Sequence, residues 1–137
     1  MEFLFPLRVY IEDTDTGGIV YYVNYLKYME RARTELLRAQ GYEQQSLKES
    51  GLIFVVHSVN SRYLRPAFMD NELQVKTAIK TLSSASILFQ QAVIRVEDKV
   101  VLCTAEIKIV SVSAKNVKPI ALPINMTKAL SQFVLTA

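Results

Sequence analysis

The second half of the chain alternates between apolar and polar positions, which is the pattern of β-strands with one buried face. In ELQVKTAIKTL, for example, positions 73, 75 and 79 are apolar and most of the positions between them are polar. Four strands are predicted in this half, at residues 52–64, 72–82, 87–96 and 100–112. The turns SSAS and EDK are too short for a crossover, so the last three strands form an antiparallel meander. In the last strand one face carries five apolar residues, Val101, Cys103, Ala105, Ile107 and Ile109.

The first half follows a helical period instead. Asn24 is a good N-cap residue, and Gly41 occupies the position at which a glycine ends a helix. We therefore expect a long helix that begins near Asn24 and ends before Gly41. Its apolar positions recur at spacings of four, three and four residues and form one stripe: Tyr25, Met29, Ala32 and Leu36.

The remaining segments complete a mixed α+β pattern. Residues 3–11 read as a strand, 12–18 as a turn, 43–50 as a short helix and 124–135 as a terminal helix. The order predicts a five-stranded antiparallel sheet whose apolar face is covered by one main helix. Such a sheet has exposed edges, and pairing of edges between two subunits is a natural way to cover them. We therefore expect a homo-oligomer.

Composition indicates one compact domain spanning residues 1–137, because half of the residues are hydrophobic and only 21% are charged. No apolar run approaches the roughly 20 residues of a membrane span. The start of the chain lacks the basic region of a signal peptide, so we expect a cytoplasmic protein. The net charge of +3 comes from scattered lysines and arginines, and we expect no nucleic-acid partner.

Cys103 and His57 are the only residues of their kinds. One cysteine allows no internal disulfide and no paired-cysteine metal site, and its apolar surroundings predict a buried thiol. One histidine excludes a multi-histidine metal site. His57 falls within a predicted strand and is interpreted as structural. We expect no metal and no cofactor.

An acidic turn precedes the long helix. Glu12, Asp13 and Asp15 lie within four residues and are followed by Gly17 and Gly18. Acids in such a turn usually form local hydrogen bonds or cap the helix. One of them could instead carry chemistry at the start of the helix.

The stretch RVYIEDTDTGGIVYYVNYLKYMERARTELLR resembles the acyl-CoA thioesterases of the hotdog fold, in the 4-hydroxybenzoyl-CoA thioesterase family. The nearest subgroup is the set of bacterial thioesterases encoded beside the Tol–Pal envelope genes. YLRPAFMDNELQV and KPIALP also resemble family segments, so the resemblance covers nearly the whole chain. It implies a five-stranded antiparallel sheet wrapped around one long central helix. It also implies active sites between two subunits, in a dimer or a tetramer.

The resemblance further implies that Asp15, and not Asp13, is the active-site acid. A backbone N–H near Tyr22 at the start of the helix is expected to point at the thioester carbonyl, and Gly17 and Gly18 are expected to let the substrate approach the chain. A helix start offers unpaired donors and partial positive charge. Those donors can stabilise the oxyanion that forms when a thioester is attacked. Asp15 could activate water or attack the carbonyl itself.

Two departures from the family pattern matter. The Tol–Pal-associated subgroup often has histidine where this chain has Tyr22, and a tyrosine is a poor general base near neutral pH. Some aryl-CoA members have a basic run in the turn that here reads LSSAS. The phosphates of coenzyme A would then be bound elsewhere, with Arg62, Arg65 and Lys80 as candidates, or the pantetheine arm would carry most of the binding.

Three functions remain open at this stage. The favoured one is hydrolysis of acyl-CoA or acyl-carrier-protein thioesters, with an alkyl or aryl acyl group. A non-catalytic protein that binds acyl thioesters would keep the pocket without needing Asp15. A hydroxyacyl-thioester dehydratase is disfavoured because such enzymes pair a histidine with an acid near the helix, and His57 lies outside that region.

Overall fold

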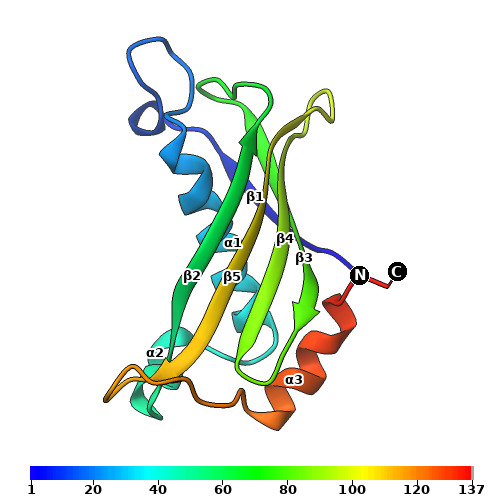
Figure 1. Cartoon of the computed structure of the whole chain (residues 1–137). Helices are drawn as coiled ribbons and strands as arrows, with labels where there is room; N and C mark the ends of the chain where they lie inside the picture. The colour runs from blue at the N-terminus through cyan, green and yellow to red at the C-terminus, as the bar shows by residue number, and fades with distance from the viewer. Residues whose placement is uncertain (137) are drawn as a thin grey trace.

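The computed structural model describes residues 1–136 and confirms the α+β class. The elements follow one another as strand, long helix, short helix, four strands and terminal helix (Figure 1). Their bounds are β1 Phe3–Arg8, α1 Val23–Ala39, α2 Gln44–Glu49, β2 Leu52–Tyr63, β3 Glu72–Leu82, β4 Ser86–Arg95, β5 Val101–Ser113 and α3 Ile124–Leu130. Short 3-10 helices span Ile11–Asp13 and Ser131–Phe133.

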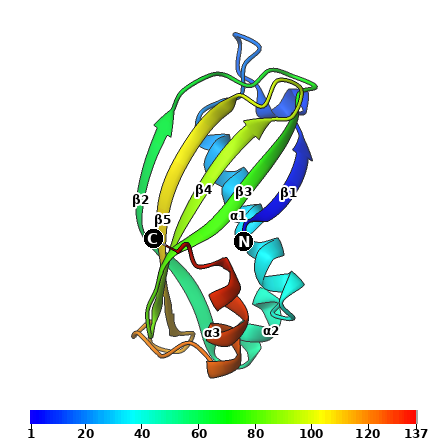
Figure 2. The same ribbon diagram turned by 90° about the vertical axis from the view of Figure 1, so that its right-hand side faces the viewer.

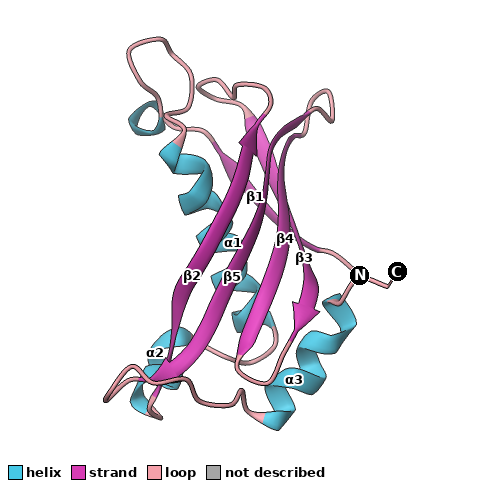
Figure 3. Cartoon of the chain, in the orientation of Figure 1, coloured by secondary structure: helices cyan, strands magenta, loops and turns pink. Residues whose placement is uncertain are grey.

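The five strands form one antiparallel sheet in the order β1-β3-β4-β5-β2 (Figure 3). The meander β3-β4-β5 lies at its centre, as the short turns predicted. β1 and β2 form the two edges. The predicted strand bounds in the second half are right to within one residue at each end. β2 is the longer edge and carries a bulge between Val56 and Ser58.

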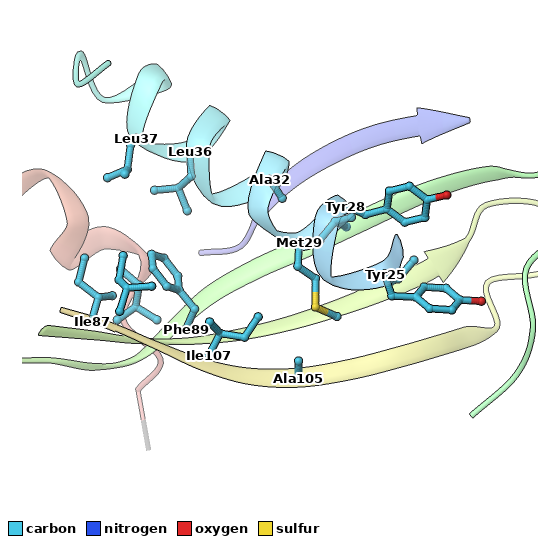
Figure 4. Packing of buried hydrophobic residues seen from close by; sticks show 14 of the residues in the cluster. Tyr25, Tyr28, Met29, Ala32, Leu36, Leu37, Ile87, Phe89, Ala105 and Ile107 are labelled. Atoms are coloured by element: carbon cyan, nitrogen blue, oxygen red, sulfur yellow. The ribbon is translucent and has the colours of Figure 1, made fainter. Parts of the chain in front are cut away.

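Helix α1 lies across the inner face of the sheet and packs mainly on β1, β3 and β4. The predicted stripe of α1 is confirmed, because each of its four residues is almost completely buried. Side chains such as Met29, Phe89 and Ile107 meet between the helix and the sheet (Figure 4). Helices α2 and α3 both lie at the end of the molecule opposite the 12–22 loop (Figure 2).

Three sequence-based expectations need correction. The first strand ends at Arg8 and not at residue 11, because the chain turns into the 3-10 helix at Ile11. Asn24 is not the N-cap of α1: the helix begins at Val23, after Tyr22, and Asn24 is buried within the first turn. Val101 does not share the buried face of β5, because a register shift opposite Val93 leaves it 37% exposed.

Within residues 1–136, no helix is both long and apolar enough to cross a membrane. The terminal helix predicted at 124–135 is confirmed in two pieces, α3 and the 3-10 helix that follows it. Residue 137 lies outside the described part of the chain.

Candidate active site

The segment of residues 13–21, called the acidic loop below, folds back on itself as a narrow hairpin. Thr14 and Val20 form an antiparallel bridge, and the Asp15 N–H donates to the Ile19 carbonyl at 2.9 Å. The Gly18 N–H donates to the Asp15 carbonyl at 3.0 Å, which closes the tip. Gly18 has a φ of +76°, a left-handed conformation that glycine adopts without steric cost. These local bonds bring Asp15 to the exposed end of the molecule.

The Asp15 carboxylate is held by its own turn. Its Oδ1 accepts the Gly17 N–H at 2.9 Å, and the side chain is otherwise exposed to solvent. A Cβ at Gly17 would lie 3.3 Å from that oxygen, so a glycine lets the carboxylate approach the backbone. No Lys, Arg or His in the described chain lies within ion-pair distance of Asp15. The remaining carboxylate oxygen is therefore open to a water molecule or a substrate.

The start of α1 follows directly after the acidic loop. The Asn24 and Tyr25 N–H groups donate to the carbonyls of Tyr21 and Tyr22, whereas the N–H groups of Tyr22 and Val23 have no acceptor in residues 1–136. Free donors at a helix start carry partial positive charge. Both are available to a carbonyl oxygen of a ligand.

A clamp joins the acidic loop to the helix. The Asp13 carbonyl accepts two hydrogen bonds, from the Tyr21 N–H at 2.9 Å and from Asn24 Nδ2 at 2.8 Å. Beside it, the hydroxyl of Tyr28 is fully buried and forms no hydrogen bond with the described residues. Burial and then the charge of the nearby Asp13 raise the pKa of the Tyr28 phenol. The clamp fixes the base of the loop relative to the helix start.

The segment of residues 64–71 supports the acidic loop from the other side. Its Ala67 N–H donates to the hydroxyl of Tyr25 at 2.9 Å, and its Ala67 carbonyl accepts the Val20 N–H at 2.9 Å. Ile19 bridges Phe68 in the same segment. Burial raises the pKa of Tyr25 above its ordinary value, so the phenol stays protonated at neutral pH. The loop is thus attached at two points to a neighbouring segment.

Several tyrosines surround the helix start. The ring of Tyr22 lies 5.1 Å from that of Tyr21 and 5.6 Å from that of Tyr63, both edge-on. Tyr63 also lies 5.9 Å from Tyr25. Tyr25 and Tyr28 are core residues, whereas about half of the Tyr21 and Tyr22 surface remains exposed. The Tyr22 hydroxyl forms no hydrogen bond with a described residue, and its ring contacts those of Tyr21 and Tyr63.

The structure groups some of the sequence candidates and separates others. Asp15, Gly17, Gly18 and Tyr22 lie together in the acidic loop and at the start of α1. Arg62 does not join them.

Arg62 pairs in register with Thr104, whose neighbours Cys103 and Ala105 face α1, so Arg62 lies on the outer face of the sheet. There it lines a pocket of about 440 Å³ that also contains Glu106. Arg65 is exposed in the segment that supports the acidic loop, and its N–H donates to the Leu102 carbonyl at 3.1 Å.

The remaining candidates lie away from the acidic loop. Lys80 is paired with Glu106 at 2.6 Å. His57 is exposed at the β2 bulge and not in the core. Cys103 is fully buried, as expected, and burial raises the pKa of its thiol to about 11. In the described chain no three His, Cys, Asp or Glu side chains gather closely enough to hold a metal ion.

Sequence reasoning missed two features of this region. Asn24 was interpreted as a cap, but its buried amide reaches a carbonyl eleven residues earlier. Arg33 is assigned to neither side of the helix from the sequence, and the structure buries it beside Gln91. For Arg33 the signal was available, because it follows Met29 of the apolar stripe by four residues.

Comparison with known proteins identifies the family. The profile of the thioesterase-like superfamily matches residues 9–130. The acyl-CoA thioester hydrolase YbgC of Escherichia coli O6:H1 is 38% identical over 130 residues, which cover 95% of this chain and 96% of that protein. The acyl-CoA thioesterase YbgC of Haemophilus influenzae is 43% identical over 122 residues, 88% of each chain.

A solved structure supports the same family. The probable thioesterase from Bartonella henselae superposes with a TM-score of 0.84 at 36% identity, and the match covers 90% of this chain and 100% of that one. The sheet order, the central helix and the sequence relatives all lead to one assignment. The chain belongs to the thioesterase-like superfamily and is a thioester hydrolase of the hotdog fold.

Proposed function

We propose that this protein hydrolyses acyl-CoA thioesters, or the corresponding acyl-carrier-protein thioesters, to a free acid and a thiol. One observation carries the proposal: an exposed carboxylate, Asp15, is held in a rigid hairpin that leads directly into a helix whose first N–H groups are free. The acyl-CoA thioesterase activity of relatives at 38% and 43% identity supports the same substrate class.

The chemistry divides between the two groups. The carbonyl oxygen of the thioester accepts a hydrogen bond from the Tyr22 N–H, which stabilises negative charge as the carbonyl carbon is attacked. In one route Asp15 takes a proton from water, hydroxide adds to the carbonyl carbon, and the C–S bond breaks to release a thiolate. In the other route the carboxylate itself attacks, the thiolate leaves, and water hydrolyses the resulting anhydride. Gly17 and Gly18 let the substrate approach the loop closely.

Basic residues near the top of β2 are the proposed contacts for the phosphates of coenzyme A. Arg65 is exposed beside the acidic loop, which favours it for this role. Arg62 could reach the phosphates only around the edge of the sheet, because its side chain is on the outer face. Substitution of each by methionine should therefore raise KM for acyl-CoA more at Arg65 than at Arg62.

The active form is proposed to be an oligomer in the cytoplasm. Strand β2 is twelve residues long and lies at the edge of the described sheet, so one side of its backbone has no neighbouring strand. Pairing of two such edges around a two-fold axis would join two sheets and bring a second chain close to each site. Sedimentation at micromolar concentration should show a dimer or a tetramer. A fully active monomer would refute this part of the proposal.

A thiol-release assay on a panel of acyl-CoA esters tests the proposal as a whole. Free thiol should appear in step with free acid for at least one alkyl or aryl ester. The only cysteine of the chain is fully buried, so the protein itself should contribute little to the thiol signal. A protein that binds the esters without releasing thiol would be a non-catalytic binder, and the proposal would be wrong.

A further inference from the structure

Arg33 is an arginine buried between the central helix and the sheet. Only 7% of the Arg33 surface is exposed, and Arg33 Nη1 donates to Gln91 Oε1 at 3.0 Å. The Gln91 amide in turn donates to the Met29 carbonyl at 3.0 Å and to Thr77 Oγ1 at 2.9 Å. These bonds fix the orientation of the glutamine, so its oxygen is held in place for the guanidinium.

The charge of Arg33 has no partner of opposite sign at contact distance. No carboxylate in residues 1–136 lies within 4.0 Å of it, and the acid that acts on it from farther away, Glu30, is exposed. Burial lowers the pKa of Arg33, and Glu30 partly opposes this. A buried cation with a single neutral partner is costly to the folded protein. The position is better explained if a further oxygen binds there.

The guanidinium of Arg33 has donors beyond the one that binds Gln91. Tyr28 Oη is the one side-chain polar atom of the described chain that is fully buried without a partner, so no unpaired nitrogen of Arg33 is fully buried. Arg33 instead lines a pocket of about 60 Å³ between α1 and β2. Its wall includes the apolar residues Phe54, Val56 and Ile109, and Glu30 lines the same pocket.

A largely apolar strip, interrupted by Ser61, leads along β2 from this pocket to the candidate active site. Val56, Val59 and Tyr63 pair in register with buried β5 residues, so they lie on the inner face of β2. They are nevertheless 55%, 44% and 43% exposed, because α1 packs mainly over β1, β3 and β4. The strip ends at Tyr63, whose ring lies 5.6 Å from that of Tyr22 at the helix start.

The length of the strip can be estimated from the helix. Eleven residues separate Tyr22 from Arg33, which corresponds to about 16 Å of helix. Side chains lean toward the helix N-terminus, so the long side chain of Arg33 brings its guanidinium to roughly 10–12 Å from the helix start. With C–C bonds of about 1.5 Å in a zigzag, an extended acyl chain of about eight to ten carbons spans that distance.

We propose that the strip binds the acyl part of the substrate and that Arg33 binds an oxygen at its far end, which selects acyl groups with an ω-carboxylate or an ω-hydroxyl. This inference rests on the proposed function. A guanidinium binds a carboxylate through two parallel hydrogen bonds and a hydroxyl through one. The unpaired charge and the continuity of the strip with the helix start favour a substrate as the occupant.

Three matched esters test the inference: octanoyl-CoA, 8-hydroxyoctanoyl-CoA and the mono-CoA ester of octanedioic acid. The wild-type kcat/KM should be at least about tenfold higher for the two oxygenated esters than for octanoyl-CoA, because a site built to bind an oxygen rejects an analogue that lacks it. Arg33→Met should bring these ratios close to one. Arg38→Met is the matched control, an exposed arginine of the same helix paired with Glu35 at 3.4 Å, and it should leave the ratios unchanged.

Butyryl-CoA separates the inference from the proposed function, because its chain is too short to reach Arg33. If the wild type hydrolyses butyryl-CoA and octanoyl-CoA but does not prefer the oxygenated esters, the inference is wrong and the proposed function stands. If it hydrolyses neither these four esters nor any aryl-CoA ester of the thiol-release panel, the proposed function fails as well.

Two further measurements cover the other outcomes. If Arg33→Met does not fold, Val56→Phe takes its place, because a larger ring fills the pocket in front of the guanidinium; the preference for oxygenated esters should be lost. If Arg33→Met instead changes the sedimentation of the protein and lowers kcat/KM for all four esters equally, Arg33 binds a carboxylate of a second copy and the inference is overturned.

Discussion

Truncation of Asn24 tests whether the clamp positions the acidic loop. The change Asn24→Ala removes the hydrogen bond from Nδ2 to the Asp13 carbonyl, which is 2.8 Å long and partly buried. The carbonyl keeps its second donor, the Tyr21 N–H at 2.9 Å, so no acceptor is left unsatisfied. The loop loses one of its attachments to α1 while the rest of the fold is untouched.

The expected loss of stability is small. One neutral hydrogen bond contributes about 0.5–1.5 kcal/mol net, and the better helix propensity of alanine returns up to about half a kcal/mol. The unfolding free energy should therefore fall by roughly 0.5–1 kcal/mol, which lowers Tm by about 2–4 °C for a chain of this size. The effect on the reaction should be larger. A displacement of about 1 Å at a reacting group can cost a hundredfold, so we expect kcat to fall about tenfold, with KM changed less than about twofold.

Ser50→Ala provides a control of similar energy at the opposite end of the molecule, where Ser50 Oγ donates to the Leu47 carbonyl at 2.7 Å. Urea unfolding and thiol release are measured for both variants. The account predicts similar losses of stability and a loss of kcat for Asn24→Ala alone. Equal losses of kcat in the two variants, or an unchanged kcat in Asn24→Ala, would refute the positioning role.

Three further substitutions test separate parts of the account. Gly17→Ala should lower kcat with little change in Tm, because its Cβ would lie 3.3 Å from Asp15 Oδ1 and displace the carboxylate; an unchanged kcat counts against this. Tyr22→Phe should cost less than about tenfold in kcat, because the proposed donor is the main chain; a loss of several hundredfold in a folded variant makes the phenol part of the mechanism. The pKa of the Cys103 thiol is about 11 in the folded protein, against 9.0 for a free thiol. The thiol therefore does not affect the unfolding free energy below pH 9, and the folded state loses stability as the pH rises from 9 toward 11. The unfolding free energies of wild type and Cys103→Ala, measured with urea, should therefore diverge by about 2 kcal/mol between pH 8 and pH 10.5, and parallel pH dependences would contradict the burial of the thiol.

The sequence predicts best those features that repeat along the chain. The alternation in residues 72–82 identifies β3 to the residue, and the spacing of Tyr25, Met29, Ala32 and Leu36 identifies the buried side of α1. Both signals arise because burial of one face imposes the period of the backbone on the sequence. The five-stranded α+β fold follows from them with little further information.

Contacts between distant residues are harder to predict. The amide of Asn24 bonds a carbonyl of the preceding loop, and nothing in the pattern separates that role from an N-cap. Arg33 is polar and lies on a helix, which suggests the surface, yet Gln91 from β4 provides its partner. These pairings depend on how the loop and the sheet meet the helix.

The position of Arg62 illustrates a related limit. Alternation along β2 distinguishes two faces, but this strand has few buried positions to show which face is inward. The register with β5, in which Arg62 lies opposite Thr104, puts it on the outer side of the sheet. That register depends on the bulge between Val56 and Ser58, which has no clear sequence signal.

The thiol-release rate of Asp15→Asn is the most direct test of the central claim. The Asn side chain has nearly the same size, and its oxygen can still accept the Gly17 N–H, so the loop should keep its shape. It cannot act as a base or as a nucleophile at neutral pH, so we expect kcat to fall far below one-tenth of the wild-type value. Asp13→Asn serves as the matched control two residues away and should have a much weaker effect. A folded Asp15→Asn variant that retains more than about a tenth of wild-type kcat would contradict the account.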